Sequence, residues 1–216
     1  MRFAVATACL VSTLCFSSSA RAIDIVDLFN TGVDNAGVPL SAGSTDPHYT
    51  MTANNFGSGS TTSFVINPNP AYVTSTNSRW ISVDTGDGSS INGGNYTVTY
   101  STSFVLPANA DLTSVVIQGQ WAVDNTGLDI LINGSSTGLT SPGFGSFTNF
   151  NLPTGSFVAG TNTLAFQWRN VGGPGGLNVV FTSASYELQS NAAPEPASLA
   201  LLTLVGTVLV ATRRRR

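Results

Sequence analysis

Two short acidic segments carry the residues of this chain whose type and spacing are best suited to chemistry. Asp84 and Asp87 lie in Asp-Thr-Gly-Asp-Gly, and Asp124 and Asp129 bracket Asn-Thr-Gly-Leu. Oxygen donors this close together are the hard ligands that calcium prefers, although neither segment has EF-hand spacing. We predict Asp84, Asp87, Asp124 and Asp129 as candidate ligands of a structural calcium ion, and no other cofactor. The alternative at each position is a turn carboxylate that accepts hydrogen bonds from its own backbone.

Catalytic chemistry has few candidates in this sequence. The same carboxylate pairs could act as the acid and base of a glycoside hydrolase, which keeps an enzyme as an alternative. A nucleophilic triad would have to use His48, the single histidine, but Asp46-Pro47-His48-Tyr49 is typical of a turn that enters a strand. No Gly-x-Ser-x-Gly elbow precedes a helix. We therefore assign no catalytic residue.

Aromatic side chains offer a second kind of site. An aromatic ring on a rigid sheet, beside polar groups, can hold the apolar face of a sugar ring. Trp80 follows an arginine in a polar segment and is predicted to be exposed, with Tyr49 and His48 as further candidates behind it. Trp121 and Trp168 are in phase with core positions and are expected to be buried.

Alternating apolar and polar residues predict the strands that must position these side chains. The clearest runs are Tyr96–Leu106, Val115–Val123, Leu128–Ile132, Leu164–Trp168 and Val180–Leu188. Turn signals rich in glycine, proline and asparagine separate them, among them Asn133-Gly134. No segment of the body has a sustained helical period. We therefore expect residues 23–190 to form an all-β domain of about ten short strands, an antiparallel β-sandwich of jelly-roll type.

Charge is scarce and unevenly placed. Charged residues make up 9% of the 216-residue chain, and there is no lysine. Between residues 23 and 193 ten carboxylates face two arginines, a net charge of −8. Nucleic-acid binding requires clustered lysine and arginine side chains, so nucleic acid is excluded as a partner.

The N-terminus has the layout of a secretory signal. Arg2 is followed by an apolar stretch and then by small residues that end in Ala20-Arg21-Ala22, an A-x-A cleavage pattern. We predict a signal helix over residues 1–22, with cleavage after Ala22 and Ile23 as the first mature residue. Both cysteines, Cys9 and Cys15, would be removed, so the mature protein is expected to lack disulfides.

The C-terminus carries a second signal. Pro194-Glu195-Pro196 precedes an apolar run, and the chain ends in four arginines, Arg213, Arg214, Arg215 and Arg216. Sixteen helical residues span about 24 Å, slightly less than the roughly 30 Å hydrocarbon core of a membrane. Arginines at the end of a span are retained on the cytoplasmic side, which places the body outside. A plain membrane anchor is the simplest interpretation of this segment.

This C-terminal arrangement, together with an N-terminal signal peptide, resembles the PEP-CTERM sorting signal of Gram-negative bacteria. The resemblance covers residues 191–216 and implies recognition by an exosortase-type membrane transpeptidase, in bacteria that make extracellular polysaccharide. It implies transient anchoring in the inner membrane by the hydrophobic helix. It carries no information about the body.

The body is similar in part to galactose-binding-like jelly rolls, which include sugar-binding domains attached to glycoside hydrolases. The similarity lies in three runs, Tyr96–Pro107, Trp121–Gly134 and Phe157–Phe166. It implies a shared fold more strongly than shared binding. We therefore expect an exported, non-catalytic protein of the bacterial surface or extracellular matrix that binds carbohydrate, and a secreted carbohydrate-active enzyme is the alternative.

Overall fold

The computed structural model describes residues 21–189, which form eleven strands and two short 3₁₀ helices. In chain order these are β1 (Ile23–Asp24), β2 (Thr45–Asn54), β3 (Thr62–Val65), β4 (Ile81–Ser82), η1 (Ile91–Gly94), β5 (Asn95–Leu106), β6 (Ala110–Asp124), β7 (Thr126–Ile132), β8 (Ser135–Ser136), β9 (Thr148–Asn151), η2 (Thr154–Ser156), β10 (Gly160–Val171) and β11 (Gly176–Leu188). All pairings between strands are antiparallel. The all-β prediction is confirmed.

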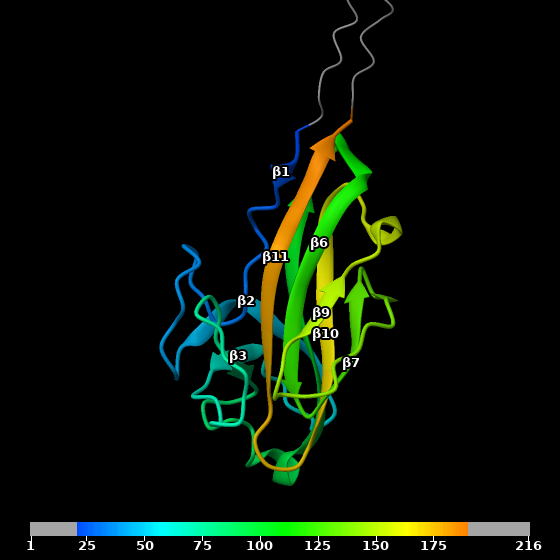
Figure 1. The fold of residues 1–216 in the computed structure, drawn as a ribbon. Helices are drawn as coiled ribbons and strands as arrows, with labels where there is room; N and C mark the ends of the chain where they lie inside the picture. The colour runs from blue at the N-terminus through cyan, green and yellow to red at the C-terminus, as the bar shows by residue number, and fades with distance from the viewer. Residues whose placement is uncertain (1–20, 190–216) are drawn as a thin grey trace, which may run out of the picture.

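The five alternating runs of the sequence become the strands β5, β6, β7, β10 and β11 (Figure 1), whereas the ten-residue β2 has no counterpart among the predicted runs. In β5 every second side chain is buried, from Tyr96 through Tyr100 to Leu106, while the residues between them are exposed or half-buried. Successive side chains of a strand point to opposite faces, so this pattern places one face of β5 against the core. Trp121 and Trp168 are fully buried, as their phase in the sequence predicts.

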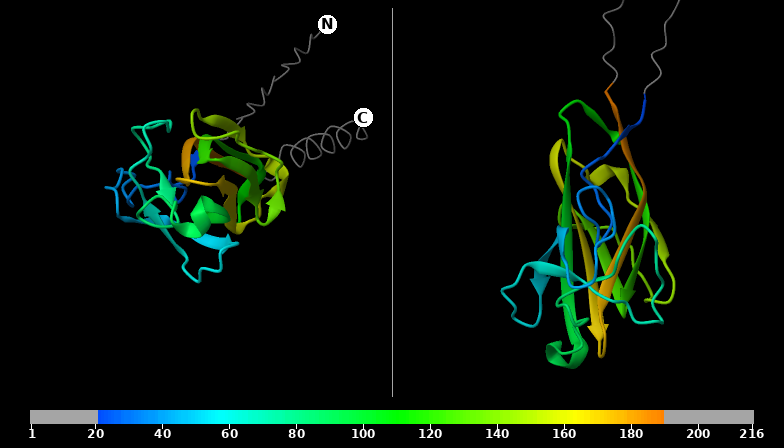
Figure 2. Two further views of the ribbon diagram at one scale, coloured as in Figure 1. Left: turned by 90° about the horizontal axis from the view of Figure 1, so that it is seen from below. Right: turned by 90° about the vertical axis from the view of Figure 1, so that its left-hand side faces the viewer.

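The strands follow one continuous path that folds back on itself into two layers. Its order is β8-β7-β10-β5-β2-β3-β4-β11-β6-β9, and β1 pairs with β11 outside this path. The short strands β3 and β4 connect the β5 layer to the β11 layer, and Figure 2 shows the two layers enclosing the core in end-on view. Aromatic rings from the two layers pack against each other in the core. The ring centroid of Phe166 in β10 lies 5.8 Å from that of Trp121 in β6 and 6.1 Å from that of Phe150 in β9. The body is therefore a β-sandwich.

The Asn133-Gly134 turn illustrates how local sequence fixes the register. Both residues have positive φ angles, 51° and 82°, as a type I′ hairpin turn requires. They join β7 to β8, with Ile132 opposite Ser135. The Asn133 side chain donates to Asn162 of β10, which connects this hairpin to its neighbouring strand.

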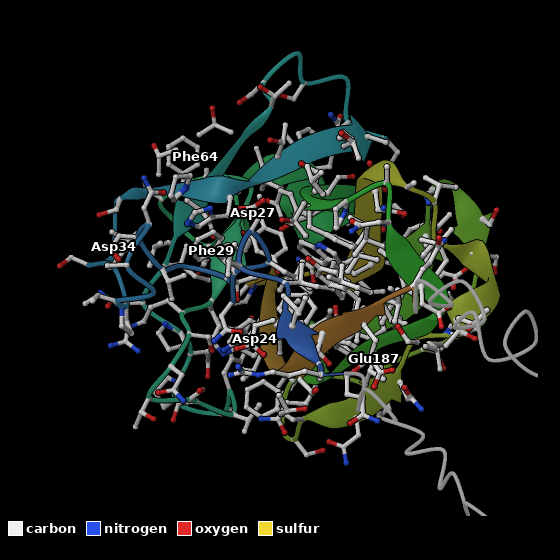
Figure 3. All side chains as sticks on the ribbon, turned by 90° about the horizontal axis from the view of Figure 1, so that it is seen from above. Asp24, Asp27, Phe29, Asp34, Phe64 and Glu187 are labelled. Atoms are coloured by element: carbon white, nitrogen blue, oxygen red, sulfur yellow. The ribbon has the colours of Figure 1, made fainter. Side chains whose placement is uncertain are left out.

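Both ends of the described chain lie at the same pole of the sandwich (Figures 1 and 2). Ile23 of β1 is paired with Tyr186 near the end of β11. Figure 3, viewed from this pole, shows Asp24 and Glu187 beside the two points where the chain enters and leaves the body. The opposite pole carries η1 and the turn between β10 and β11.

The predicted signal helix and the C-terminal sorting segment lie outside residues 21–189, apart from Arg21 and Ala22. Within the described part of the chain no helix is long and apolar enough to cross a membrane.

Candidate functional site

The aromatic sugar-binding face predicted from Trp80, Tyr49 and His48 does not form. Trp80 is 1% exposed and Tyr49 is 2% exposed, so the predicted exposure of Trp80 is wrong. Tyr49 and His48 do not pack against it: His48 stacks on Phe29 with ring centroids 3.8 Å apart, and the Tyr49 hydroxyl donates to the Phe29 carbonyl. These three residues therefore do not form one exposed aromatic face.

Trp80 is buried by segments that are distant in the sequence. Its ring lies 4.3 Å from that of Tyr72, which in turn lies 5.3 Å from Phe144. Its indole Nε1 donates to the Val73 carbonyl at 2.8 Å. These residues, with Ile66 and Ala122, form a small hydrophobic cluster separate from the main core. The polar neighbours of Trp80 in the sequence gave no signal of this packing.

Two of the four predicted calcium ligands accept hydrogen bonds from their own loops. Asp84 accepts from the backbone of Gly86 and Gly88, and Asp87 accepts from the backbone of Ser89. These contacts match the turn-residue alternative. Asp129 instead lies in β7 and accepts from the Ser136 hydroxyl of β8 and from the backbone just after it. Within residues 21–189 no three acidic, histidine or cysteine side chains come together as a metal site, so calcium binding stays a prediction that this geometry does not favour.

Asp124 has a different environment from the other three. It is 5% exposed, and its Oδ2 accepts a 2.5 Å hydrogen bond from the Tyr72 hydroxyl, while its Oδ1 is buried without a partner. Burial raises the pKa of Asp124, and the Tyr72 hydrogen bond opposes that rise only in part. Burial and the nearby carboxylate raise the pKa of Tyr72 as well. The contact holds the segment that contains Tyr72 against the end of β6.

A pocket of about 400 Å³ borders the Trp80 cluster, with Ile66 and Trp80 in its wall, where three loops meet the start of β11. We call it the Arg79 pocket. Its walls are Pro39, Leu40, Ser41, Ala42, Ile66, Asn67, Pro68, Thr74, Ser75, Ser78, Arg79, Trp80 and Asn178. Hydroxyl and amide groups dominate its polar lining, Arg79 is its single charged residue, and it contains no carboxylate or histidine.

The Arg79 side chain is held from one edge. Its Nη1 donates to the carbonyls of Ser78 at 2.9 Å and Ser75 at 3.3 Å. Neither of these bonds goes to a carboxylate, although the body has ten. The Nε and Nη2 donors make no hydrogen bond within residues 21–189. A guanidinium fixed in this way presents two parallel N–H groups, the geometry that binds planar acceptors in a bidentate manner.

Asn178 supplies a second free donor. It is 1% exposed, and its Oδ1 accepts a 2.6 Å hydrogen bond from the Ser78 hydroxyl. A separation of 2.6 Å is typical of an O–H···O bond and short for N–H···O, so it places the amide oxygen toward Ser78. The Nδ2 group is buried and has no hydrogen-bond partner among residues 21–189. Because an unpartnered buried donor costs about 1–3 kcal/mol, it is an attractive position for an acceptor supplied by a ligand.

A buried hydrogen-bond network positions both donors. The Thr31 hydroxyl donates to the Arg79 carbonyl at 2.8 Å and accepts from the Val179 backbone, next to Asn178. Asp46 in turn accepts a 2.6 Å bond from the Gly32 backbone, which fixes this segment. Gly32 has a φ of 65°, and a Cβ there would lie 2.4 Å from the Cβ of Arg79. Glycine is therefore required where the segment crosses Arg79. Burial raises the pKa of Asp46 despite the hydrogen bonds that it accepts.

Sequence reasoning missed Asn178. It interrupts the apolar run Leu177-Asn178-Val179-Val180 at the start of a strand. An amide flanked on both sides by buried apolar residues must find partners inside the protein, and that signal could have identified it. Its contacts to Thr31 and Ser78 span 147 and 100 residues of sequence, so the pocket itself could not be inferred from local pattern.

Comparison with known proteins assigns no family: no family model and no curated protein matches the sequence. Among solved structures, a CBM35 from Paenibacillus barcinonensis is 16% identical with a TM-score of 0.34, covering 63% of this chain and 94% of that one. The Podospora anserina GH26-CBM35 beta-(1,4)-mannanase is 12% identical with a TM-score of 0.30, covering 82% of this chain and only 29% of that one. At scores this low the site has to be interpreted from its own geometry.

Proposed function

We propose that this chain is an exported, non-catalytic protein of the bacterial surface or extracellular matrix that binds a saccharide in the Arg79 pocket. The observation that carries the proposal is the pocket's lining. Serine and threonine hydroxyls and asparagine amides surround a hollow of about 400 Å³, with aliphatic and proline surface between them. Hydroxyl and amide groups match the hydroxyls of a sugar, and the apolar wall matches its carbon skeleton.

The same lining favours binding over hydrolysis. Enzymatic cleavage of a glycosidic bond generally uses two carboxyl groups on either side of the scissile oxygen. The Arg79 pocket has none; Asp84 and Asp87 accept hydrogen bonds within their own loops, and Asp129 of β7 accepts them across its hairpin. A carbohydrate-active enzyme remains the alternative, and its best candidate acid is Asp124, whose pKa is raised by burial.

Export and sorting are proposed from the two terminal segments. The signal-peptide pattern ending at Ala22 and the Pro194-Glu195-Pro196 segment with its terminal arginines support secretion and processing by an exosortase-type transpeptidase. We further propose that the sandwich is of the galactose-binding-like jelly-roll type. These proposals place the body on the outer side of the membrane, where extracellular polysaccharide is the available ligand.

A glycan array probed with the full-length protein tests the proposal, in parallel with a hydrolysis assay on the same glycans. We expect binding to at least one glycan class and no release of reducing ends. Asn178→Gln tests the pocket as the binding site, because it moves the amide while keeping its chemistry and should lower binding. Turnover of any glycan that Asp124→Asn abolishes would establish the enzyme alternative instead.

A further inference from the structure

The free donors of the Arg79 pocket specify more than a neutral sugar. A sugar hydroxyl both donates and accepts hydrogen bonds, whereas a carboxylate only accepts them. The pocket's unused charged group and its unused buried group are both donors: the Nε and Nη2 edge of Arg79 and the buried Nδ2 of Asn178, while the exposed side chains of Ser41, Asn67 and Thr74 can donate or accept. No carboxylate in the lining competes for them.

We propose that the Arg79 pocket recognises a carboxylate carried on the saccharide, as in a uronic acid residue. This inference rests on the saccharide binding proposed above and names the chemical class within it. The free edge of Arg79 binds the carboxylate through two parallel hydrogen bonds, and the Asn178 amide donates to a further acceptor of the same ligand.

Charge placement supports this assignment. The body carries ten carboxylates and only two arginines between residues 23 and 193. Arg79 nevertheless makes its hydrogen bonds to backbone carbonyls, which hold the side chain in place without neutralising it. The half-buried guanidinium therefore keeps its charge available for a ligand, and the local dielectric strengthens the interaction relative to bulk water.

The second arginine provides a matched control. Arg169 is exposed on β10, in the opposite layer, and does not line the pocket. Arg79→Gln and Arg169→Gln change the net charge by the same amount. A general effect of charge on an acidic ligand would therefore affect both variants equally, whereas specific recognition affects only Arg79→Gln.

The test is calorimetric titration of the full-length protein with a glucuronic acid hexasaccharide and with a neutral glucose hexasaccharide. We expect the acidic hexasaccharide to bind more tightly, and Arg79→Gln to weaken its binding about 10- to 100-fold, the range of a charge-assisted bidentate contact. Arg79→Lys keeps the charge but not the paired donors, so it should recover only part of this loss. Arg169→Gln should leave the affinity within about twofold of wild type. Near-ultraviolet circular dichroism of each variant checks that the fold is intact.

The outcomes separate this inference from the function on which it rests. Equal affinity for the two hexasaccharides, or equal losses in Arg79→Gln and Arg169→Gln, overturns the carboxylate assignment and leaves saccharide binding in place. Failure of both hexasaccharides and of the glycan array overturns saccharide binding itself. Competition with free acetate completes the test. If millimolar acetate fully displaces the acidic hexasaccharide, the pocket binds any small carboxylate, and the proposal that its ligand is an acidic saccharide is overturned.

Discussion

Trp80 provides the sharpest test of how the pocket is built, because the sequence and the structure assign it opposite roles. An exposed sugar platform would contribute to ligand affinity and little to stability. In the structure Trp80 is 1% exposed, packs on Tyr72 and donates to the Val73 carbonyl. We therefore predict that Trp80→Ala acts first on the stability of the domain.

The expected size of the effect follows from these contacts. Truncation of a buried tryptophan to alanine costs about 3–5 kcal/mol, which combines lost transfer energy with the cavity that is left. Loss of the indole hydrogen bond adds about 1 kcal/mol at most, because Val73 is half-buried and water can replace the donor. The total is a large share of the roughly 5–15 kcal/mol that stabilises a typical domain. Trp80→Phe keeps an aromatic contact with Tyr72 and should cost only about 1–2 kcal/mol.

Urea unfolding of the full-length protein, followed by circular dichroism, measures these differences as shifts in midpoint at constant slope. Arg79→Gln is the complementary variant, expected to lose ligand affinity with a midpoint close to wild type. The reasoning is refuted if Trp80→Ala unfolds within about 0.5 kcal/mol of wild type and yet loses glycan binding. That pair of results would mean that the ring faces a ligand.

Three further predictions concern pH, packing and processing. Burial raises the pKa of Asp124 in the folded state above its ordinary value of 3.8, so the folded protein holds this proton more tightly than the unfolded chain does. The stability that Asp124 contributes is therefore present at low pH and is lost as pH rises through its folded-state pKa. Asp124→Asn should flatten the dependence of the urea midpoint on pH. An unchanged pH profile would contradict a raised pKa for Asp124. Gly127→Ala should lower the free energy of unfolding by about 1–3 kcal/mol, since its Cβ would lie 2.4 Å from the Trp121 ring, whereas Gly145→Ala has open space and should be neutral in the same assay. Intact mass of the exported protein should show Ile23 at the N-terminus and loss of the residues after 194–196; retention of the terminal arginines would favour a plain anchor.

The long strands were predictable because their signal is local. The alternation of apolar and polar residues within β5 or β10 indicates which face of the strand packs against the core. A turn such as Asn133-Gly134 needs only its own two residues to reverse the chain. The short strands β3 and β4 contain too few residues to show a period, yet they carry the sheet from one layer to the other. The sequence therefore predicts the class of fold but not the order of the strands through the two layers.

The site was less predictable, because its contacts are long in sequence. Trp80 has polar neighbours, and only the fold places Tyr72 and Phe144 over its ring. Arg79 and Asn178 are about a hundred residues apart, and they meet because β11 runs beside the segment that carries Arg79. The acidic segments misled for a related reason. The spacing of Asp84 and Asp87 suits calcium but suits a turn equally well, and the hydrogen bonds within their loop match the turn, while Asp129 lies in β7 and bonds across its hairpin.

The position of Asn178 on β11 has a mechanical consequence. β11 begins at the pocket and ends at the pole where the chain leaves the body, about 40 Å away at the rise of an extended strand. If the body binds a polymer in the pocket and is tethered through its C-terminal segment, as proposed above, a load on the molecule pulls along this strand. β11 is paired with β6 along nearly its whole length, from Gly176 opposite Asp124 to Leu188 opposite Ala110. Under that proposal, a pull on the end of β11 loads its hydrogen bonds to β6 together in shear instead of peeling them one by one, so this ladder resists the separation of the strand from the sandwich.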